Sequence, residues 1–270
     1  MNYIEGGQPV LKKSYCVFMD VLGFSEMISR SSGTENEQEV FQRYHEITSQ
    51  LITRLNEHVG DDSVLQMKVF SDNIVLALPW FSRDGESEFG SVLLALREYQ
   101  LSMALNGYFV RGGMSVGQLF VDNNMIYGKA LLDAYALESK VANDPKIIIS
   151  DEVLEIVRSH TRFYAHPQNS PQNSDVVIDA DGRGFISYLD ELIEEGDYDY
   201  QLNTARLLQH KDKVMEAVNL YRTNTKVWYK YHWLCDYHNY FCSRVSHING
   251  YTDDCLIPES VYKRELNSLV

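Results

Sequence analysis

The feature that most limits the possible folds of this chain is a nearly unbroken apolar run at residues 14–21 (SYCVFMDV). A strand without polar–apolar alternation is typical of the middle of a sheet that is covered on both faces. An acid, Asp20, stands near the end of the run, and residues 22–25 (LGFS) then indicate a tight turn. We therefore expect a central buried strand with a carboxylate at its end.

Helical and strand patterns alternate along the next part of the chain. Apolar residues three and four apart predict helices over 39–55, 88–105, 131–142 and 151–158. Strands are expected at 67–78, with a hinge at 71–73, on both sides of 111–117 (RGGMSVG), at 147–149, and at 176–178 and 184–189. Hairpins next to helices favour an α/β or α+β sheet with helices on its faces.

A polar segment, Glu194-Glu195-Gly196-Asp197, indicates a boundary between residues 1–195 and a helical extension at 196–270. Two long helices are expected in the extension, over 201–222 and 226–247. The second has an apolar face that should pack on the preceding domain or on a partner subunit. Cys235, His238 and Cys242 share a helix face, but zinc usually takes ligands from two elements. Buried cysteines acting as small apolar side chains are the favoured interpretation.

Composition excludes several classes of function. The 270 residues carry a net charge of −14 at pH 7, whereas proteins that bind the nucleic-acid backbone need a basic surface. The same charge repels a free triphosphate, so a nucleotide site would need metal ions or local cations. No apolar run approaches the ~20 residues of a membrane span, and the N-terminus lacks an apolar leader. We expect a cytoplasmic protein that binds neither nucleic acid nor membrane.

Two aspartates stand where carboxylates need an explanation. Asp20 follows an apolar strand, and Asp72 lies at the tip of an apolar hairpin. Such a pair at the mouths of neighbouring strands can hold two divalent ions, which activate an attacking oxygen and steady a polyphosphate leaving group. The Gly23 turn would let backbone N–H groups approach phosphate oxygens. Each aspartate alone is also compatible with ordinary turn or helix-cap chemistry.

Five strings, in order over residues 15–153, resemble the motifs of class III adenylate and guanylate cyclases. Residues 20–25 (DVLGFS) and 68–72 (KVFSD) look like the two metal motifs of that family. Residues 111–117 are similar to its Arg-x-Gly-hydrophobic-His-x-Gly strand, with Ser115 in place of the histidine. The remaining similarities are Tyr127-Gly128, Ala134 and Leu137-Glu138, at the spacing of the next family helix, and residues 145–150 (PKIIIS), which resemble its next strand.

The resemblance implies an α+β fold whose mixed sheet is mostly antiparallel and carries flanking helices. It implies that Asp20 and Asp72 bind two Mn²⁺ or Mg²⁺ ions per site, assisted by the Val21 carbonyl. The phosphates would be held by the turn made of Leu22, Gly23, Phe24 and Ser25. The ribose 3′ oxygen would attack the α-phosphate and release pyrophosphate. Because family sites form between two catalytic domains, a homodimer with two sites is expected.

The chain departs from the family at two positions that serve the ribose and the transition state. Where most members have Asn and Arg, this sequence has Leu132 and Ala136. Asp133 offers a partial substitute for the Asn after a small shift, and Lys129 or Lys140 for the Arg. The departure leaves open a non-catalytic nucleotide-binding or dimerisation module.

Base recognition also departs from both purine patterns. Adenylate cyclases read adenine with the Lys at position 68 and an acid at position 125, which here is Met125. A thioether cannot accept from an exocyclic amine as a carboxylate does, and guanylate cyclases usually carry Glu in place of Lys68. A purine cyclase with rebuilt base contacts remains an alternative.

The pairing of MDVLGFS with FSDN, the RGGMSVG strand with its serine, and a tail with His210-Lys211 and residues 230–239 (KYHWLCDYHN) resemble the bacterial pyrimidine cyclases of the Pycsar anti-phage system. That resemblance implies UTP, or in some branches CTP, as the substrate, and a cyclic nucleotide that activates a downstream effector. Tyr44 would narrow the base pocket for a pyrimidine, unless it is an ordinary core residue on an apolar helix face. Arg183, in the turn at residues 181–184, would contact the triphosphate, unless it is an ordinary exposed turn residue.

Overall fold

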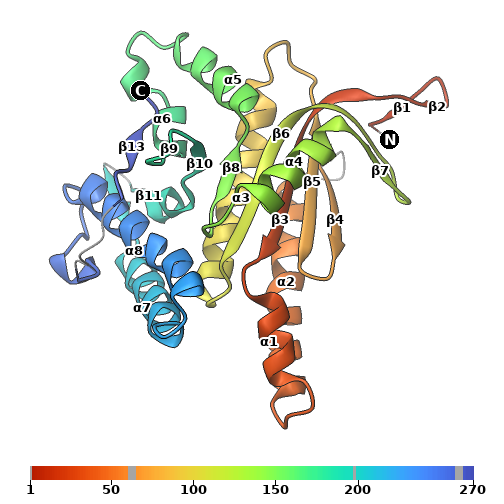
Figure 1. Ribbon diagram of the computed structural model, residues 1–270. Coiled ribbons are helices and arrows are strands. Elements are labelled where there is room, and N and C mark those ends of the chain that lie inside the picture. Colours follow the sequence, from red (N-terminus) through yellow and green to blue (C-terminus); the bar gives the residue numbers. More distant parts are fainter. Residues whose placement is uncertain (1, 60–64, 197–198, 259–263) are drawn as a thin grey trace.

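The computed structural model describes residues 2–59, 65–196, 199–258 and 264–270. The strands of its main sheet are β3 (Lys12–Val21), β4 (Gln66–Phe70), β5 (Asn73–Pro79), β6 (Val110–Val121), β7 (Ile126–Gly128), β8 (Ile147–Ile149), β9 (Val176–Ile178), β10 (Gly184–Ile186) and β13 (Asn267–Ser268). Their order is β13-β9-β10-β8-β6-β3-β5-β4, and β7 also pairs with β6 (Figure 1). All pairs are antiparallel except β6 and β8. The expected α+β fold with a mostly antiparallel sheet is confirmed.

Helices cover both faces of this sheet around its central strand, β3. One face packs on α2 (Glu37–Val59), α3 (Glu86–Leu105) and α5 (Asp151–Thr161) through one large apolar cluster. The opposite face packs on α4 (Lys129–Lys140), and it includes Cys16 and Phe18 of β3. Alternate β3 side chains therefore enter two different cores, as the unbroken apolar run predicts.

Strand β6 runs through the RGGMSVG string without a break, so the expectation of two strands flanking it is wrong. The glycines serve close packing instead of a turn. A Cβ on Gly112 would lie 2.7 Å from the Phe18 carbonyl oxygen of β3, and one on Gly113 would lie 2.5 Å from the Ala134 carbonyl oxygen of α4. The string thus lets β3 and α4 approach the strand closely.

The two expected C-terminal helices are confirmed as α7 (Thr204–Leu220) and α8 (Thr225–Val245). They share an apolar cluster with the end of α3 and with β10, in which Phe185 meets Trp233 and Tyr237. The indole N–H of Trp233 donates to Asp179 Oδ2 at 3.1 Å, and Lys146 forms an ion pair with the same carboxylate. Segment 196–270 therefore shares a buried core with segment 1–195. Asp197, the last residue of the predicted boundary, lies outside the described residues.

The remaining α-helices and strands are short. One of them, α1 (Phe24–Ser31), directly follows the turn at the end of β3. The others lie at the periphery and are α6 (Gln172–Asp175), β1 (Ile4–Glu5), β2 (Gln8–Pro9), β11 (Ile193–Glu195) and β12 (Tyr200–Leu202). The pairs β1–β2 and β11–β12 form two-stranded sheets. Among the helices of the described ranges, none is long and apolar enough to cross a bilayer.

Candidate active site

Asp20 lies near the end of β3 and faces Arg111 across the sheet, where β3 pairs with β6. Nε of Arg111 donates to Oδ1 of Asp20 at 2.8 Å, and Nη2 donates to Oδ2 at 2.9 Å. Such a two-bond pair is among the stronger polar contacts in proteins, because the planar guanidinium matches the carboxylate. The sequence reasoning used Arg111 only as a motif residue. Its pairing with Asp20 depends on strand register, which no local pattern gives.

Glu138 reaches the same cluster from α4. Its Oε1 lies 2.8 Å from Nη2 of Arg111, as an ion pair without hydrogen-bond geometry. Burial, and after it the neighbouring charge of Asp20, raise the pKa of this carboxyl to about 7, while Arg111 opposes the shift. Ala130, Ala134 and Glu138 line up along the buried side of α4. An acid on that apolar stripe is the signal by which the sequence could have identified Glu138 as a site residue.

Asp72 lies in the turn between β4 and β5, directly after Ser71, whose φ of 61° is in the left-handed region. Burial raises the pKa of Asp72, and the charge of Asp20 raises it further, whereas Arg111 lowers it. The structure therefore brings the two predicted aspartates close enough to repel each other. A divalent cation between such carboxylates would replace repulsion with attraction.

The donor set at this point suits Mg²⁺ or Mn²⁺. Magnesium is usually bound through one or two carboxylates together with substrate phosphates and water. Within the residues that the structure describes, no group of three or more His, Cys, Asp or Glu side chains is arranged for a metal ion. An ion held by Asp20 and Asp72 would take its remaining ligands from backbone carbonyl oxygens, substrate or water.

The turn after β3 places a helix N-terminus beside the aspartates. Gly23 has a φ of 81° and caps α1, which begins at Phe24. The Leu22 N–H donates to the Phe109 carbonyl oxygen at 2.8 Å. Ser25 is exposed in the first turn of α1. Free N–H groups and the positive end of the helix dipole make such a turn a suitable place for phosphate oxygens.

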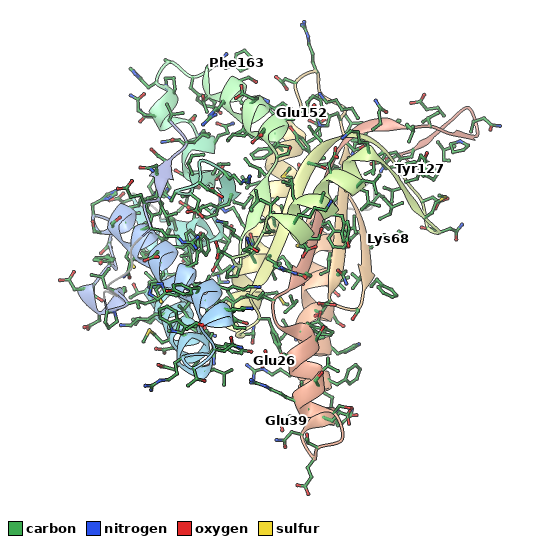
Figure 2. The ribbon with its side chains drawn as sticks, in the orientation of Figure 1. Glu26, Glu39, Lys68, Tyr127, Glu152 and Phe163 are labelled. Carbon is green, nitrogen blue, oxygen red and sulfur yellow. The ribbon has the colours of Figure 1, made fainter. Side chains whose placement is uncertain are left out.

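Lys68 and Met125, the two positions assigned to the base, line one cavity of about 460 Å³. Nζ of Lys68 donates to the Asn123 carbonyl oxygen at 3.0 Å. The cavity opens between β4, β5 and β7, and its other walls are Phe18, Phe70, Asn73, Val75, Asn124 and Ile126. Asp20 and Asp72 are not among the lining residues. Figure 2 shows Lys68 on β4 and Tyr127 on β7, at the edge of the sheet remote from the C-terminal helices.

Tyr44 lies on the other face of the sheet from this cavity. Its ring packs against Phe24 at 5.0 Å and Tyr108 at 5.6 Å between ring centroids, within the core cluster of α2 and α3. Phe18 and Val75, which line the Lys68 cavity, belong to the core on the α4 face. The structure thus brings Tyr44 to Phe24, in the turn after β3, rather than to Lys68 and Met125.

Arg183 and residues on the exposed side of α4 line a second cavity, distinct from the one at Lys68. This cavity, of about 380 Å³, is lined by Asp133, Ala136, Lys140 and Arg183 together with β8 residues. Leu132 is 66% exposed on the same helix. Asp133 is paired with Lys129, whose Nζ lies 2.7 Å from Oδ1. These residues are separate from the Asp20 cluster of the same chain.

Ser115, which replaces the family histidine, ties β6 to α4. Its hydroxyl donates to the Ala130 carbonyl oxygen at 2.6 Å, and the side chain is buried. In this chain the position therefore has a packing role that a bulkier imidazole could not take without moving the helix.

Comparison with protein-family models and with curated proteins finds no match. Among solved structures, the chain is similar to the adenylyl cyclase CyaB from P. aeruginosa, with 18% identity, a TM-score of 0.40, and coverage of 55% of this chain and 82% of that one. It is similar to the guanylate cyclase domain of RhGC from Catenaria anguillulae, with 15% identity, a TM-score of 0.41 and coverage of 64% and 93%.

A third similar structure is a class III adenylyl cyclase-like ATP-binding protein from Pseudomonas aeruginosa. It is 12% identical, with a TM-score of 0.43 and coverage of 56% of this chain and 37% of that one. All three are adenylyl or guanylate cyclases or a cyclase-like protein, at low sequence identity. Because the TM-scores are below 0.5, the residues of the chain itself have to support any function.

Proposed function

We propose that this chain is a nucleotide cyclase that converts UTP into 3′,5′-cyclic UMP and pyrophosphate. The observation that carries the proposal is the cluster of Asp20, Asp72 and Arg111 beside the Gly23 turn. It combines two carboxylates, a partly buried cation and a helix N-terminus. Few reactions other than phosphoryl chemistry need all three together.

In this proposal, Asp20, Asp72 and the Val21 carbonyl would hold two Mn²⁺ or Mg²⁺ ions, and such ions would supply positive charge for activating the ribose 3′ oxygen and for steadying pyrophosphate. Arg111, released from Asp20, pairs with a phosphate oxygen. The N–H groups of Gly23, Phe24 and Ser25 face the other phosphate oxygens, since that of Leu22 is bonded to the Phe109 carbonyl oxygen. The bond from the 3′ oxygen to the α-phosphorus forms, the bond from that phosphorus to the bridging oxygen breaks, and the hydroxyl proton leaves to water.

The cavity at Lys68 and Met125 supports a pyrimidine. Lys68 can only donate, so it suits a ring carbonyl oxygen, and uracil carries two of them. The cavity also contains the amide side chains of Asn73 and Asn124, whose oxygens can accept from the uracil N3–H. Adenine would need an acceptor at position 125, which Met125 does not provide. CTP, which keeps one ring carbonyl, is the alternative substrate, with cyclic CMP as its product.

We propose a homodimer in which the aspartates of one subunit meet the base cavity of its partner. Large apolar side chains are exposed around this cavity and on the α4 helix beside it, with Phe70 82% exposed, and they include Met125, Leu132 and Tyr135. Tyr135 packs edge-on against Phe18, a cavity residue. Contiguous exposed apolar surface of this kind marks an interface. A second copy would bury it and complete both sites.

A cyclic pyrimidine nucleotide made in this way would serve as an intracellular second messenger. We propose that it activates an effector protein in defence against phage, as the sequence resemblance implies, and that the enzyme therefore works in the cytoplasm. Arg183 and α4 of one subunit would face the triphosphate held by the other. The absence of Asn and Arg at Leu132 and Ala136 favours a second candidate function, a module that binds triphosphates without turnover.

The test is incubation of the purified protein with ATP, GTP, UTP and CTP separately, with Mn²⁺ or with Mg²⁺, followed by mass spectrometry of the products. We expect cyclic UMP, and loss of product in Asp20→Asn and Asp72→Asn. The matched control is Asp253→Asn, an exposed acid in the C-terminal segment, which should leave turnover unchanged. Product from ATP or GTP alone would remove the pyrimidine assignment. Triphosphate binding without any product would favour the non-catalytic module.

A further inference from the structure

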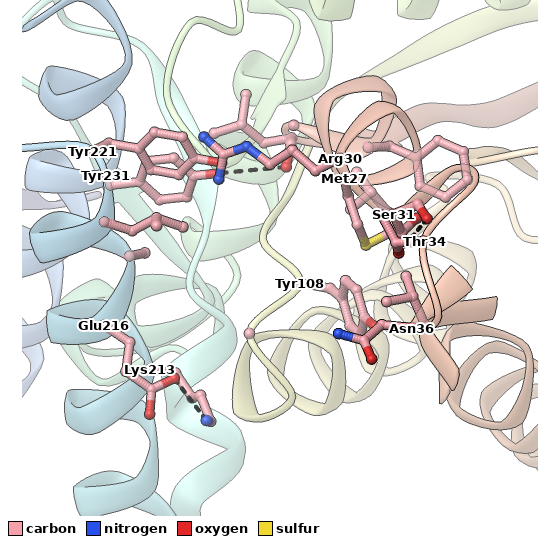
Figure 3. A pocket seen from close by; sticks show the side chains of 18 residues that line it. Met27, Arg30, Ser31, Thr34, Asn36, Tyr108, Lys213, Glu216, Tyr221 and Tyr231 are labelled. Atoms are coloured by element: carbon pink, nitrogen blue, oxygen red, sulfur yellow. Dashed lines mark hydrogen bonds and ion pairs between the residues drawn. The ribbon is translucent and has the colours of Figure 1, made fainter. Parts of the chain in front are cut away.

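The turn that follows β3 is in contact with the C-terminal helices. A cavity of about 500 Å³ separates α1 from α7 and α8, and its walls include Gly23, Arg30, Tyr221 and Tyr231. Figure 3 shows Tyr221 and Tyr231 extending from the helical segment toward α1, and Arg30 extending from α1 toward the two rings.

Both peptide groups of Leu22 are engaged at that contact. Its N–H donates to the Phe109 carbonyl oxygen at 2.8 Å, and its carbonyl oxygen accepts from the Tyr231 hydroxyl at 3.4 Å. The Phe109 ring also packs edge-on against the Tyr231 ring, with centroids 5.7 Å apart. The residue that starts the turn is therefore fixed on one side by Phe109, directly before β6, and on the other by α8.

Tyr231 is itself held in place by its neighbours. It is buried, and its ring stacks in parallel on Tyr221, with 4.9 Å between centroids. The guanidinium of Arg30 lies 5.6 Å from the Tyr221 centroid and is paired with Glu26 at 2.5 Å. A continuous set of contacts thus joins the two C-terminal helices to the start and the end of α1.

Gly23 fits between these parts closely. A Cβ at this position would lie 3.3 Å from the Tyr231 hydroxyl oxygen, which is tighter than most real contacts. The backbone, with φ at 81°, already favours glycine. The turn and the tyrosine are therefore packed against each other as well as hydrogen bonded.

We propose that Tyr231 is a positioning residue that fixes the phosphate turn from the C-terminal helices. It touches no reacting atom and acts through the Leu22 carbonyl. The inference rests on the proposed function for its effect on triphosphate binding. The C-terminal helices would thus help to position the active site, since movement of α7 and α8 would displace the turn that holds the phosphates.

The experiment compares Tyr231→Phe with Tyr240→Phe, a half-buried tyrosine on the same helix. With UTP and Mn²⁺, we expect the KM of Tyr231→Phe to rise about three- to tenfold with kcat nearly unchanged, because one hydrogen bond to the turn is lost. Hydrogen exchange at residues 22–25 should become faster in this variant only. Loss of folded protein would instead lower kcat at an unchanged KM.

The inference is overturned if Tyr231→Phe matches the wild type or Tyr240→Phe in both KM and exchange, or if exchange changes and KM does not. Failure of the proposed function is a different result, because it would appear as undiminished product in Asp20→Asn. If the wild type gives no product, UTP affinity measured by equilibrium dialysis replaces KM, with the same expected ratio. The exchange measurement needs no turnover.

Discussion

The guanidinium of Arg111 occupies both carboxylate oxygens of Asp20. The acid that the sequence marks as a metal ligand is therefore fully paired within its own chain. Asp72 and Glu138 stand beside the same cation, and burial raises the pKa of each of them. Without metal, Arg111 supplies the positive charge that three clustered acids require.

Replacing this cation should make stability depend on metal. Arg111→Gln should lower the unfolding free energy of the metal-free protein by about 1–3 kcal/mol, since a part-buried carboxylate loses its partner. Added Mn²⁺ should restore more stability to the variant than to the wild type, because the ion replaces the missing charge. Thermal unfolding with and without Mn²⁺ measures both effects. Equal Mn²⁺ shifts in the two proteins would contradict the prediction.

The control for that experiment is Arg158→Gln. Arg158 forms a surface pair with Glu155 at 3.6 Å on α5. Exposed pairs of this kind contribute little, typically under about 1 kcal/mol. Its stability should show the same response to Mn²⁺ as the wild type.

Gly23→Ala should damage triphosphate binding more than Gly33→Ala. Both glycines have left-handed φ values, 81° and 74°, so alanine adds similar backbone strain of about 1 kcal/mol. Only at Gly23 does the new Cβ also press on the Tyr231 hydroxyl, whereas at Gly33 no atom lies within 4 Å. UTP titration of both variants measures the difference. Equal losses would mean that strain alone, and not the contact with α8, matters at the turn.

A double variant separates the two causes further. In Gly23→Ala combined with Tyr231→Phe, the hydroxyl that meets the new Cβ is absent. The loss of UTP affinity should then be smaller than the sum of the two single losses, as expected for residues in contact. Strict additivity would indicate that the two positions do not interact.

Mixing two inactive variants should restore activity if sites form between subunits. Asp20→Asn removes a metal ligand and Lys68→Ala removes the donor in the base cavity, so each homodimer should be inactive or strongly impaired. A heterodimer keeps one complete site, and random pairing makes half of the dimers mixed. Turnover should therefore recover to about a quarter of the wild-type rate. No recovery, although mixed dimers form, would show that each chain uses its own Asp20 and Lys68.

Local patterns predicted most of the fold. The apolar run of β3, the helical spacing of α2 to α4 and the two helices of the C-terminal segment are all present close to their expected bounds. The RGGMSVG string misled because glycine serves both turns and close packing, and only the neighbours of Gly112 and Gly113 distinguish the two. Those neighbours belong to β3 and α4.

The candidate site was predicted less completely, because its contacts also join residues that are distant in the sequence. Asp20 and Asp72 stood out because acids at strand ends need an explanation. Arg111 pairs with Asp20, and Glu138 with Arg111, only after β6 and α4 are in place, and Arg111 lies 91 residues from Asp20. The contact of Tyr231 with Leu22 spans 209 residues. Contacts over such separations leave no periodicity in the sequence.

Two buried histidines in the C-terminal helices have a defined protonation pattern. Nε2 of His238 must donate to the Cys255 carbonyl oxygen, 2.8 Å away, because a carbonyl only accepts. Its Nδ1 then accepts from Nδ1 of His210 at 2.9 Å, and Nε2 of His210 accepts from the Tyr188 hydroxyl at 2.8 Å. Both rings are neutral in this arrangement. A second proton on His238 would be on Nδ1, where its N–H would point at the Nδ1–H of His210.

Stability should therefore fall as the pH drops below about 6.5. Burial lowers the pKa of His238 from 6.5 to about 4, and it lowers that of His210 well below its usual value. Between about pH 6.5 and pH 4, the unfolded chain binds a proton at His238 that the folded chain does not. The unfolding free energy therefore decreases with falling pH, by up to about 3 kcal/mol for His238. Above pH 6.5 neither state is protonated and this loss is absent.

Urea unfolding at pH 7.5 and pH 5.0 measures this effect in the wild type, His238→Gln and His247→Gln. His238→Gln should be less stable at pH 7.5, because Cys255 and His210 lose their partner, but it should lose less stability on acidification, since one depressed group is gone. His247 is exposed at the end of α8, so His247→Gln should keep the wild-type difference between the two pH values. An unchanged difference in His238→Gln would mean that other groups, and not this buried pair, set the acid sensitivity of the fold.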